Sequence, residues 1–380
     1  MTFTRTAALL LGVLLAAFAG HTFSDHASSS AKTEKHYLYV ASPGIRNYVE
    51  FGGVGILVFD IDAGYKFVKR IPTWSNAAGV TAENVKGVVA NAQTAKIYVS
   101  TPQRVACFDL LTEKKVWEKE FAANEYAGGA DRMALSPDGK TMYVPSFEGP
   151  HWLVINALNG EVIKKLVLNS GAHNTIYSLD GQHAYLAGLK SPLLRVTDTK
   201  THEVTREIGP FGNVIRPFTI NGAQSLVYVN VNDLLGFEIG DLKTGKVLQR
   251  VEVTGVEKGP VKRHGCPAHG VGLTPDEREV WICDGHNEML HVFDNTVMPP
   301  RQIKSLKLRE QPGWITFSLD GKHAWPSTGE IIDVKSKKII TTLTDETGRP
   351  THSEKIVQID FADSKPVRVG DQFGLGRRTR

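Results

Sequence analysis

Cysteine, long apolar segments and strong charge imbalance are all scarce in this chain of 380 residues. It has three cysteines and no Cys-x-x-Cys pair, so the spacings of common zinc sites and of c-type haem attachment are absent. The formal net charge is only +4 at pH 7, and no long lysine or arginine run occurs in the body of the chain. A nucleic-acid partner is therefore not expected.

Several catalytic and fibrous signatures are missing as well. No nucleophile elbow or Ser-His-Asp arrangement appears, which disfavours a covalent serine mechanism, and no glycine-rich phosphate loop appears either. Glycine does not recur at every third position, which excludes a collagen-like chain. Hydrophobic residues make up 41% of the chain, which is typical of a folded protein and too many for a disordered one.

The first twenty residues indicate targeting. Arg5 gives a positive start, residues 7–19 form a short apolar run, and Ala17-Phe18-Ala19 fits a small-x-small cleavage site. We predict a signal peptide over residues 1–19 and a flexible lead-in over 20–35, with an uncleaved helix as the alternative. No later apolar stretch is long enough for a bilayer, so we expect no stable membrane insertion and export to the periplasm or the medium.

The mature chain carries a repeat that starts with a small polar residue and has an aromatic residue seven positions later. The clearest copy contains Ser136-Pro-Asp-Gly, followed by Tyr143-Val144. Six copies place the polar residue at positions 91, 136, 178, 221, 274 and 318, with spacings of 45, 42, 43, 53 and 44 residues. A seventh aromatic residue, Tyr39, lies in a Tyr-Val strand with no first half ahead of it.

Each repeat indicates four short strands, because an apolar segment, a Pro-Asp-Gly hairpin, a Tyr-Val strand and two further strands follow one another. Four strands at this period are typical of one propeller blade. The sequence therefore predicts an all-β, seven-bladed β-propeller over residues 36–361, with four antiparallel strands per blade.

The first strand of blade one is expected from the other end of the chain. Residues 355–361 form a lone apolar strand, which we predict to pair beside Tyr37–Val40 and close the ring. Deletion of residues 352–380 is therefore expected to leave an unfolded or aggregating protein. Residues 362–380 are expected to form a C-terminal extension that ends in a basic tail.

On its Ser-Pro-Asp-Gly turn and Tyr-Val strand, the chain resembles the YVTN-repeat propellers, which share the seven-bladed fold of lactonase-like propellers. Only blade three keeps Ser136-Pro-Asp-Gly intact, and blades two and five have lost it. The resemblance implies the fold of residues 36–361. It implies no single activity, because the family includes binding proteins, surface proteins and enzymes, and because the motif residues are structural.

Propeller geometry predicts which residues meet at one mouth of the central channel. The positions five residues before each repeat's polar residue are Lys86, Asp131, His173, Arg216, His269 and Gly313. Loops and the closing strand are expected to add Arg46, Arg132, His151, His286, His352, Glu354 and Lys355. This mouth is therefore expected to be polar, and a solvated rim without a ligand is the simplest interpretation of it.

Two functional interpretations assign roles to these residues. In a binding site, a small anionic molecule would contact Lys86, Asp131, Arg132, His151, His286, His352 and Arg46. In a catalytic site, His173 or His269 would be the general base. Arg216 and Lys86 would hold an anionic substrate, with Glu354 or Asp131 as acid or orienting group.

A divalent metal is a further option at this mouth, with His173, His269 and His286 as the candidate ligands through neutral imidazoles. They come from separate loops, and no His-x-x-x-His spacing supports them. No other cofactor is expected.

The three cysteines have different surroundings in the sequence. Cys107 follows the third-strand pattern and is expected to be buried. In blade six, Gly270 is expected roughly opposite Cys283, and Cys266 lies just upstream on the same face, so a disulfide between Cys266 and Cys283 is predicted for an oxidising compartment. It would close a loop of about 17 residues and stabilise the fold by on the order of 3 kcal/mol. Free thiols and a metal or redox site are the alternatives.

Three functions fit these observations. The first is an exported monomeric propeller that binds a small anionic ligand or a protein partner at the polar mouth. The second is a lyase or hydrolase that acts on a sugar acid or lactone with His/Arg acid-base chemistry, with or without a metal. The third is a partner subunit of a periplasmic redox enzyme.

Overall fold

The structure is a computed structural model that describes residues 34–74, 80–121, 126–261 and 265–379. The predicted signal peptide lies outside these ranges, as does the lead-in up to residue 33. Every regular element in the described ranges is a β-strand. In that part of the chain, no helix occurs that is long and apolar enough to cross a membrane.

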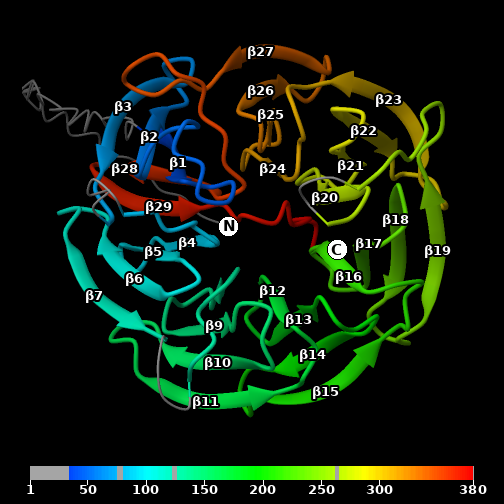
Figure 1. The fold of residues 1–380 in the computed structure, drawn as a ribbon, viewed down its shortest axis with the longest axis horizontal. Coiled ribbons are helices and arrows are strands. Elements are labelled where there is room, and N and C mark those ends of the chain that lie inside the picture. Colours follow the sequence, from blue (N-terminus) through cyan, green and yellow to red (C-terminus); the bar gives the residue numbers. More distant parts are fainter. Residues whose placement is uncertain (1–33, 75–79, 122–125, 262–264, 380) are drawn as a thin grey trace, which may run out of the picture. The chain divides into compact units, whose positions relative to one another are not determined.

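The strands form seven antiparallel sheets, which surround a common centre as the blades of a propeller (Figure 1). Blade one combines β28 (Ile356–Ala362), β1 (Glu34–Ser42), β2 (Gly55–Asp60) and β3 (Lys66–Ile71). Blade two contains β4 (Gly87–Asn91), β5 (Lys96–Ser100), β6 (Arg104–Asp109) and β7 (Lys115–Glu120). Blade three contains β8 (Ala134–Leu135), β9 (Thr141–Pro145), β10 (His151–Asn156) and β11 (Val162–Val167).

The other four blades follow in chain order around the ring. Blade four contains β12 (Ala172–Tyr177), β13 (His183–Gly188), β14 (Leu194–Asp198) and β15 (Glu203–Ile208). Blade five contains β16 (Ile215–Ile220), β17 (Leu226–Val231), β18 (Gly236–Asp241) and β19 (Val247–Glu252). Blade six contains β20 (Ala268–Leu273), β21 (Glu279–Asp284), β22 (Met289–Asp294) and β23 (Arg301–Lys307). Blade seven contains β24 (Ile315–Phe317), β25 (His323–Pro326), β26 (Glu330–Asp333) and β27 (Lys338–Thr342). The predicted seven-bladed architecture is confirmed.

The repeat residues explain why each blade forms. In blade three, the Ser136 hydroxyl donates to Asp138 and accepts the backbone N–H of Thr141 at 2.9 Å, so it ties the hairpin between β8 and β9. The aromatic residue seven positions later, Tyr143, is fully buried and packs edge-on against Tyr177 of the next blade. One residue therefore fixes the turn, and the other fixes the contact between blades.

The ring closes as predicted, with a shift of one residue in the closing strand. β28 pairs antiparallel with β1, and Tyr39 lies opposite Val357. The structure adds one strand that the sequence did not predict, β29 (Lys365–Val369), which pairs with the channel side of β28. Blade one therefore has five strands, and part of the expected extension belongs to the sheet.

Residues 370–378, which we call the C-terminal strap, run from β29 across the centre of the ring towards β16 (Figure 1, red). The Gln372 side chain accepts the Val88 N–H of blade two at 3.2 Å and donates to the Met133 carbonyl of blade three at 3.2 Å. The Gly374 carbonyl accepts from Thr219 of blade five at 2.7 Å and from the Leu273 N–H of blade six at 2.8 Å. The strap thus joins separate blades through groups that face the channel.

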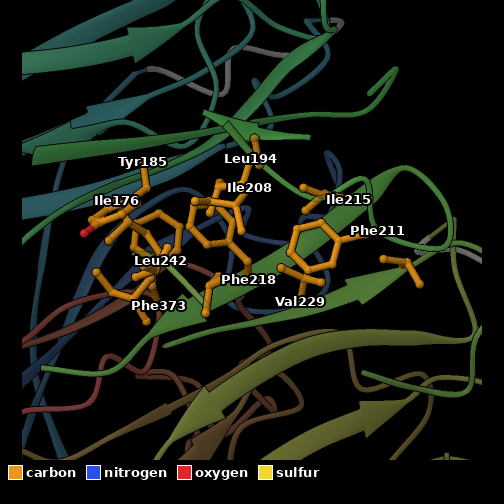
Figure 2. Packing of buried hydrophobic residues seen from close by; sticks show 14 of the residues in the cluster. Ile176, Tyr185, Leu194, Ile208, Phe211, Ile215, Phe218, Val229, Leu242 and Phe373 are labelled. Carbon is orange, nitrogen blue, oxygen red and sulfur yellow. The ribbon is translucent and has the colours of Figure 1, made fainter. Parts of the chain in front are cut away.

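The strap also completes the hydrophobic core. Phe373 and Leu375 belong to the buried cluster that fills the space between blades four and five. Figure 2 shows Phe373 among the labelled side chains of this cluster, with Leu242 and Phe218 as further members. Trp314 of blade seven belongs to the same cluster, and its indole N–H donates to the Gln372 carbonyl.

Candidate functional site

A cavity of about 240 Å³ lies at the end of the channel where the first strands of the blades begin. Its lining residues include Arg46, Lys86, Arg132, His173, Arg216, His269, Glu354 and Lys355. These residues come from blades two to six, from the segment before β28 and from the insertion after β1. The structure therefore gathers most of the sequence-predicted site residues around one space.

Three of these side chains sit at the same structural irregularity. In blades four, five and six, one extra residue interrupts the pairing of the first strand, between Ala172 and Thr175, between Ile215 and Phe218, and between Ala268 and Val271. His173, Arg216 and His269 each lie within such a bulge. A bulge bends its strand and re-aims a side chain, which explains how three regular blades present polar groups to one cavity.

The bulge in blade six needs a glycine. Gly270 has a φ of +119°, and a Cβ atom there would lie 2.8 Å from the Cα of Trp314. Any other residue would be strained and would clash with the backbone of blade seven. This close approach holds His269 in place, because its Nδ1 donates to the Gly313 carbonyl at 2.8 Å. In the neutral ring, Nε2 is then the nitrogen that carries the lone pair.

Asp131 and His173 form a buried carboxylate–imidazole pair. The side chain of Asp131 is fully buried, and it hydrogen-bonds Nδ1 of His173, whose ring reaches the cavity wall. Burial lowers the pKa of His173, so the ring is neutral at pH 7 and Nδ1 donates to Asp131. Burial alone would raise the pKa of Asp131, but the His173 contact and the charges of Lys86 and Arg132 hold it below its ordinary value.

A second buried ionic group borders the same cavity. Glu354 accepts hydrogen bonds from Arg132 and from Nζ of Lys355, the latter at 2.8 Å. Lys355 also donates to the Gly44 carbonyl at 2.8 Å. All three charged side chains are less than 10% exposed. Burial and the charges of Arg132 and Lys86 lower the pKa of Lys355 to about 7, although Glu354 acts in the opposite direction.

Trp314 packs against the Arg132 member of this ionic group. The Arg132 guanidinium lies 3.9 Å from the centre of the Trp314 ring, which is a cation–π contact. The edge of the same ring is held by the strap, through Gln372 and an edge-on contact with Phe373 at 6.0 Å. The C-terminal strap therefore fixes the position of a charged residue of the cavity through one tryptophan.

The charged side chains that line the cavity are mainly basic. Five basic side chains line it, against the two carboxylates of Glu148 and Glu354. Two of the basic groups are held by neighbours: the Arg216 Nε donates to Asn232 at 2.7 Å, and the Lys86 ammonium lies 4.4 Å above the Phe147 ring. Pre-positioned cations in a partly enclosed space attract and orient a small anion.

Three predicted ligand-binding histidines do not line this cavity. His151 is buried, with its ring near Gly128. His286 lies against Gly259, and His352 stacks on Phe51 with ring centres 4.3 Å apart. His151 begins β10, and His286 and His352 lie in connecting segments, so the repeat does not specify where any of the three rings points. Asp131 does not line the cavity either, but it contacts His173, which does.

The structure does not contain the predicted disulfide. The three cysteines have free thiols and are buried. The Cys266 thiol donates to the Ala268 carbonyl at 2.7 Å, and the Cys283 thiol donates to the Trp314 carbonyl at 3.2 Å. Cys283 packs into the core shared by blades six and seven, while Cys266 turns back on its own segment, so the two sulfurs face different surroundings.

The candidate metal ligands are not gathered together either. His173 and His269 line the cavity, but His286 does not. Across the described ranges, no group of three or more His, Cys, Asp or Glu side chains is placed to hold a metal ion. The described part of the chain thus shows no metal-ligand set at this cavity.

Sequence reasoning did not assign a role to Lys355 or Trp314. In blade seven, the position five residues before the repeat's polar residue is Gly313. Trp314, whose ring contacts Arg132, is the next residue, so the alignment of the repeats did not select it. The charge pattern His352-x-Glu354-Lys355 did mark the segment before the closing strand. Nothing in the sequence indicates that the Lys355 side chain is almost completely buried.

Comparisons with known proteins support the fold. No family model matches the chain, and no curated protein matches it either. A solved structure titled as a periplasmic gluconolactonase of Pseudomonas aeruginosa, PpgL, is similar to this chain with a TM-score of 0.63. The identity is 15%, and the match covers 84% of this chain and 98% of that one. At this identity the likeness shows the fold alone, and the YVTN-repeat assignment stays a prediction.

Proposed function

We propose that this protein hydrolyses a small lactone that carries a carboxylate. The observation that carries the proposal is the buried Asp131–His173 pair, which opens into a small cavity whose charged walls are mainly basic. The similarity in fold to a gluconolactonase is compatible with this proposal.

The proposed reaction uses His173 as the general base. Water attacks the lactone carbonyl while Nε2 of His173 takes its proton, and the ionised Asp131 stabilises the resulting imidazolium. The contact of Nε2 with the Arg132 guanidinium is 3.5 Å long, and it is therefore weak enough for a water molecule to replace it. The ring C–O bond then breaks, and the alkoxide takes the proton from His173 to give a hydroxy acid.

The basic residues have two separate roles in this reaction. Arg132, which is fixed by Glu354 and Trp314, stabilises the negative charge that develops on the carbonyl oxygen. Arg216 and Lys86 hold the substrate carboxylate. His269 lines the same cavity, and its ring is oriented by the hydrogen bond from Nδ1 to the Gly313 carbonyl.

The test is continuous titration of the acid released from carboxylate-bearing sugar lactones and from a neutral aldonolactone. His173→Asn is expected to lower kcat by about 100-fold or more, which is typical of losing a general base. His183→Asn is the matched control, since His183 starts the neighbouring strand and does not line the cavity. The absence of hydrolysis for every lactone, or full activity of His173→Asn, would refute the mechanism. Tight binding without turnover would instead support a binding protein.

A further inference from the structure

Lys355 stands out among the lysines of this protein. Its side chain is only 3% exposed, yet it borders the cavity that also contains Arg132 and Lys86. Buried lysines are rare unless their charge is paired, because taking an ammonium ion out of water is costly. The carboxylate of Glu354 pairs with Lys355, but the same oxygen also accepts from Arg132.

The hydrogen bonds around Nζ match a neutral amine. Nζ has two acceptors, the Gly44 carbonyl and Glu354, each at 2.8 Å. A neutral amine has two N–H groups and one lone pair, so both donors are satisfied and the lone pair is left over. The depressed pKa of Lys355 agrees with this count.

We propose that Lys355 is a covalent attachment site, which forms an imine with a small oxo acid bound in the cavity. The carboxylate of such a compound is the chemistry that Lys86, Arg132 and Arg216 favour, and its carbonyl is the group that attacks by an amine require. This inference goes beyond lactone hydrolysis and does not depend on it.

The step balances without any oxidant or reductant. The Nζ lone pair adds to the carbonyl carbon, and one proton passes from Nζ to the carbonyl oxygen, which gives a neutral carbinolamine. The hydroxyl group then leaves as water when it is protonated, while nitrogen loses its remaining proton and the C=N bond forms. Glu354, which already touches Nζ, is placed to relay these protons.

The experiment traps the imine by reduction. The full-length protein is incubated at neutral pH with pyruvate or glyoxylate and sodium cyanoborohydride, and the adducts are located by intact mass and peptide mapping. An exposed lysine with a pKa near 10.4 is neutral in about one molecule in a thousand at pH 7.4, whereas Lys355 is largely neutral. We therefore expect one adduct per chain at Lys355, formed at least tenfold faster than at exposed lysines.

Two variants sharpen the result. Lys355→Met is expected to abolish the fast adduct, while Lys140→Met, which changes an exposed hairpin lysine, leaves it unchanged. If Lys355→Met fails to fold, the pH dependence of each mapped adduct in the unaltered protein decides the matter. The Lys355 rate should level off above neutral pH, while the rates at exposed lysines keep rising. Adducts spread evenly over the surface, or an unmodified Lys355, would overturn the proposal whether or not lactones are hydrolysed.

Discussion

Phe373 provides the most direct test of how far the C-terminal strap stabilises the propeller. Its side chain is buried in the core of blades four and five (Figure 2) and makes an edge-on contact with the Trp314 ring. Replacing a buried phenylalanine with alanine typically costs about 3–5 kcal/mol, because apolar contacts are lost and a cavity remains. We expect Phe373→Ala to lower the free energy of unfolding by this amount, since the strap is hydrogen-bonded to blades on both sides and cannot fill the gap freely.

The assay is urea unfolding followed by tryptophan fluorescence. With a urea dependence of about 3 kcal/mol per molar, a loss of this size lowers the midpoint by roughly 1–1.7 M. Val367→Ala is the matched control, because Val367 lies on the neighbouring β29 and is 44% exposed, and its change should stay within about 0.5 kcal/mol. A loss below about 1 kcal/mol for Phe373→Ala would show that the strap rests on the blades without stabilising them.

Four further predictions follow from the site and its surroundings. Asp131→Asn should reduce lactone hydrolysis by about 100-fold or more with little change in KM, because the imidazolium of His173 loses its partner; equal kinetics in a steady-state assay would contradict this. The three cysteine thiols should resist a thiol reagent in the native protein, because all three are buried and burial raises the pKa of Cys107 to about 12. All three should react after unfolding, and fewer than three reactive thiols would reveal a disulfide. Gly270→Ala should destabilise the fold by about 1–3 kcal/mol, measured by thermal unfolding, because of its positive φ and the contact with Trp314. Between pH 7 and 10.5 the unfolded chain binds more protons at residue 355 than the folded chain does. The free energy of unfolding should therefore rise with pH by up to about 1.36 kcal/mol per pH unit relative to Lys355→Met. Parallel pH profiles of the two proteins would refute the lowered pKa of Lys355.

The sequence predicted the blades well because their defining residues act locally. Ser136 and Tyr143 fix a turn and a contact between neighbouring blades, and similar pairs recur along the chain. The same periodicity located Lys86, His173, Arg216 and His269 at one end of the channel. Their association with a ligand stays a prediction.

Features that depend on contacts between distant segments could not be derived in this way. β29 and the strap carry no repeat signature, because they satisfy channel-facing groups of several blades instead of building a blade. The ring positions of His151 at the start of β10, and of His286 and His352 in connecting segments, depend on neighbours that the repeat does not specify, such as Phe51 beside His352. The prediction of a disulfide was wrong for a related reason. The sequence spacing indicates that Cys266 and Cys283 belong to one blade, but it does not determine which way each thiol points.

The position of the strap in the chain has a consequence for protein synthesis. Residues 356–378 are translated after blades two to seven, yet they supply the first strand of blade one and the support under Trp314. A ribosome that stops early therefore releases a product with an open ring and an unsupported Arg132. Completion of the polypeptide and assembly of the cavity are coupled, so only chains translated through Phe373 acquire the complete cavity, and premature termination leaves its support unfinished.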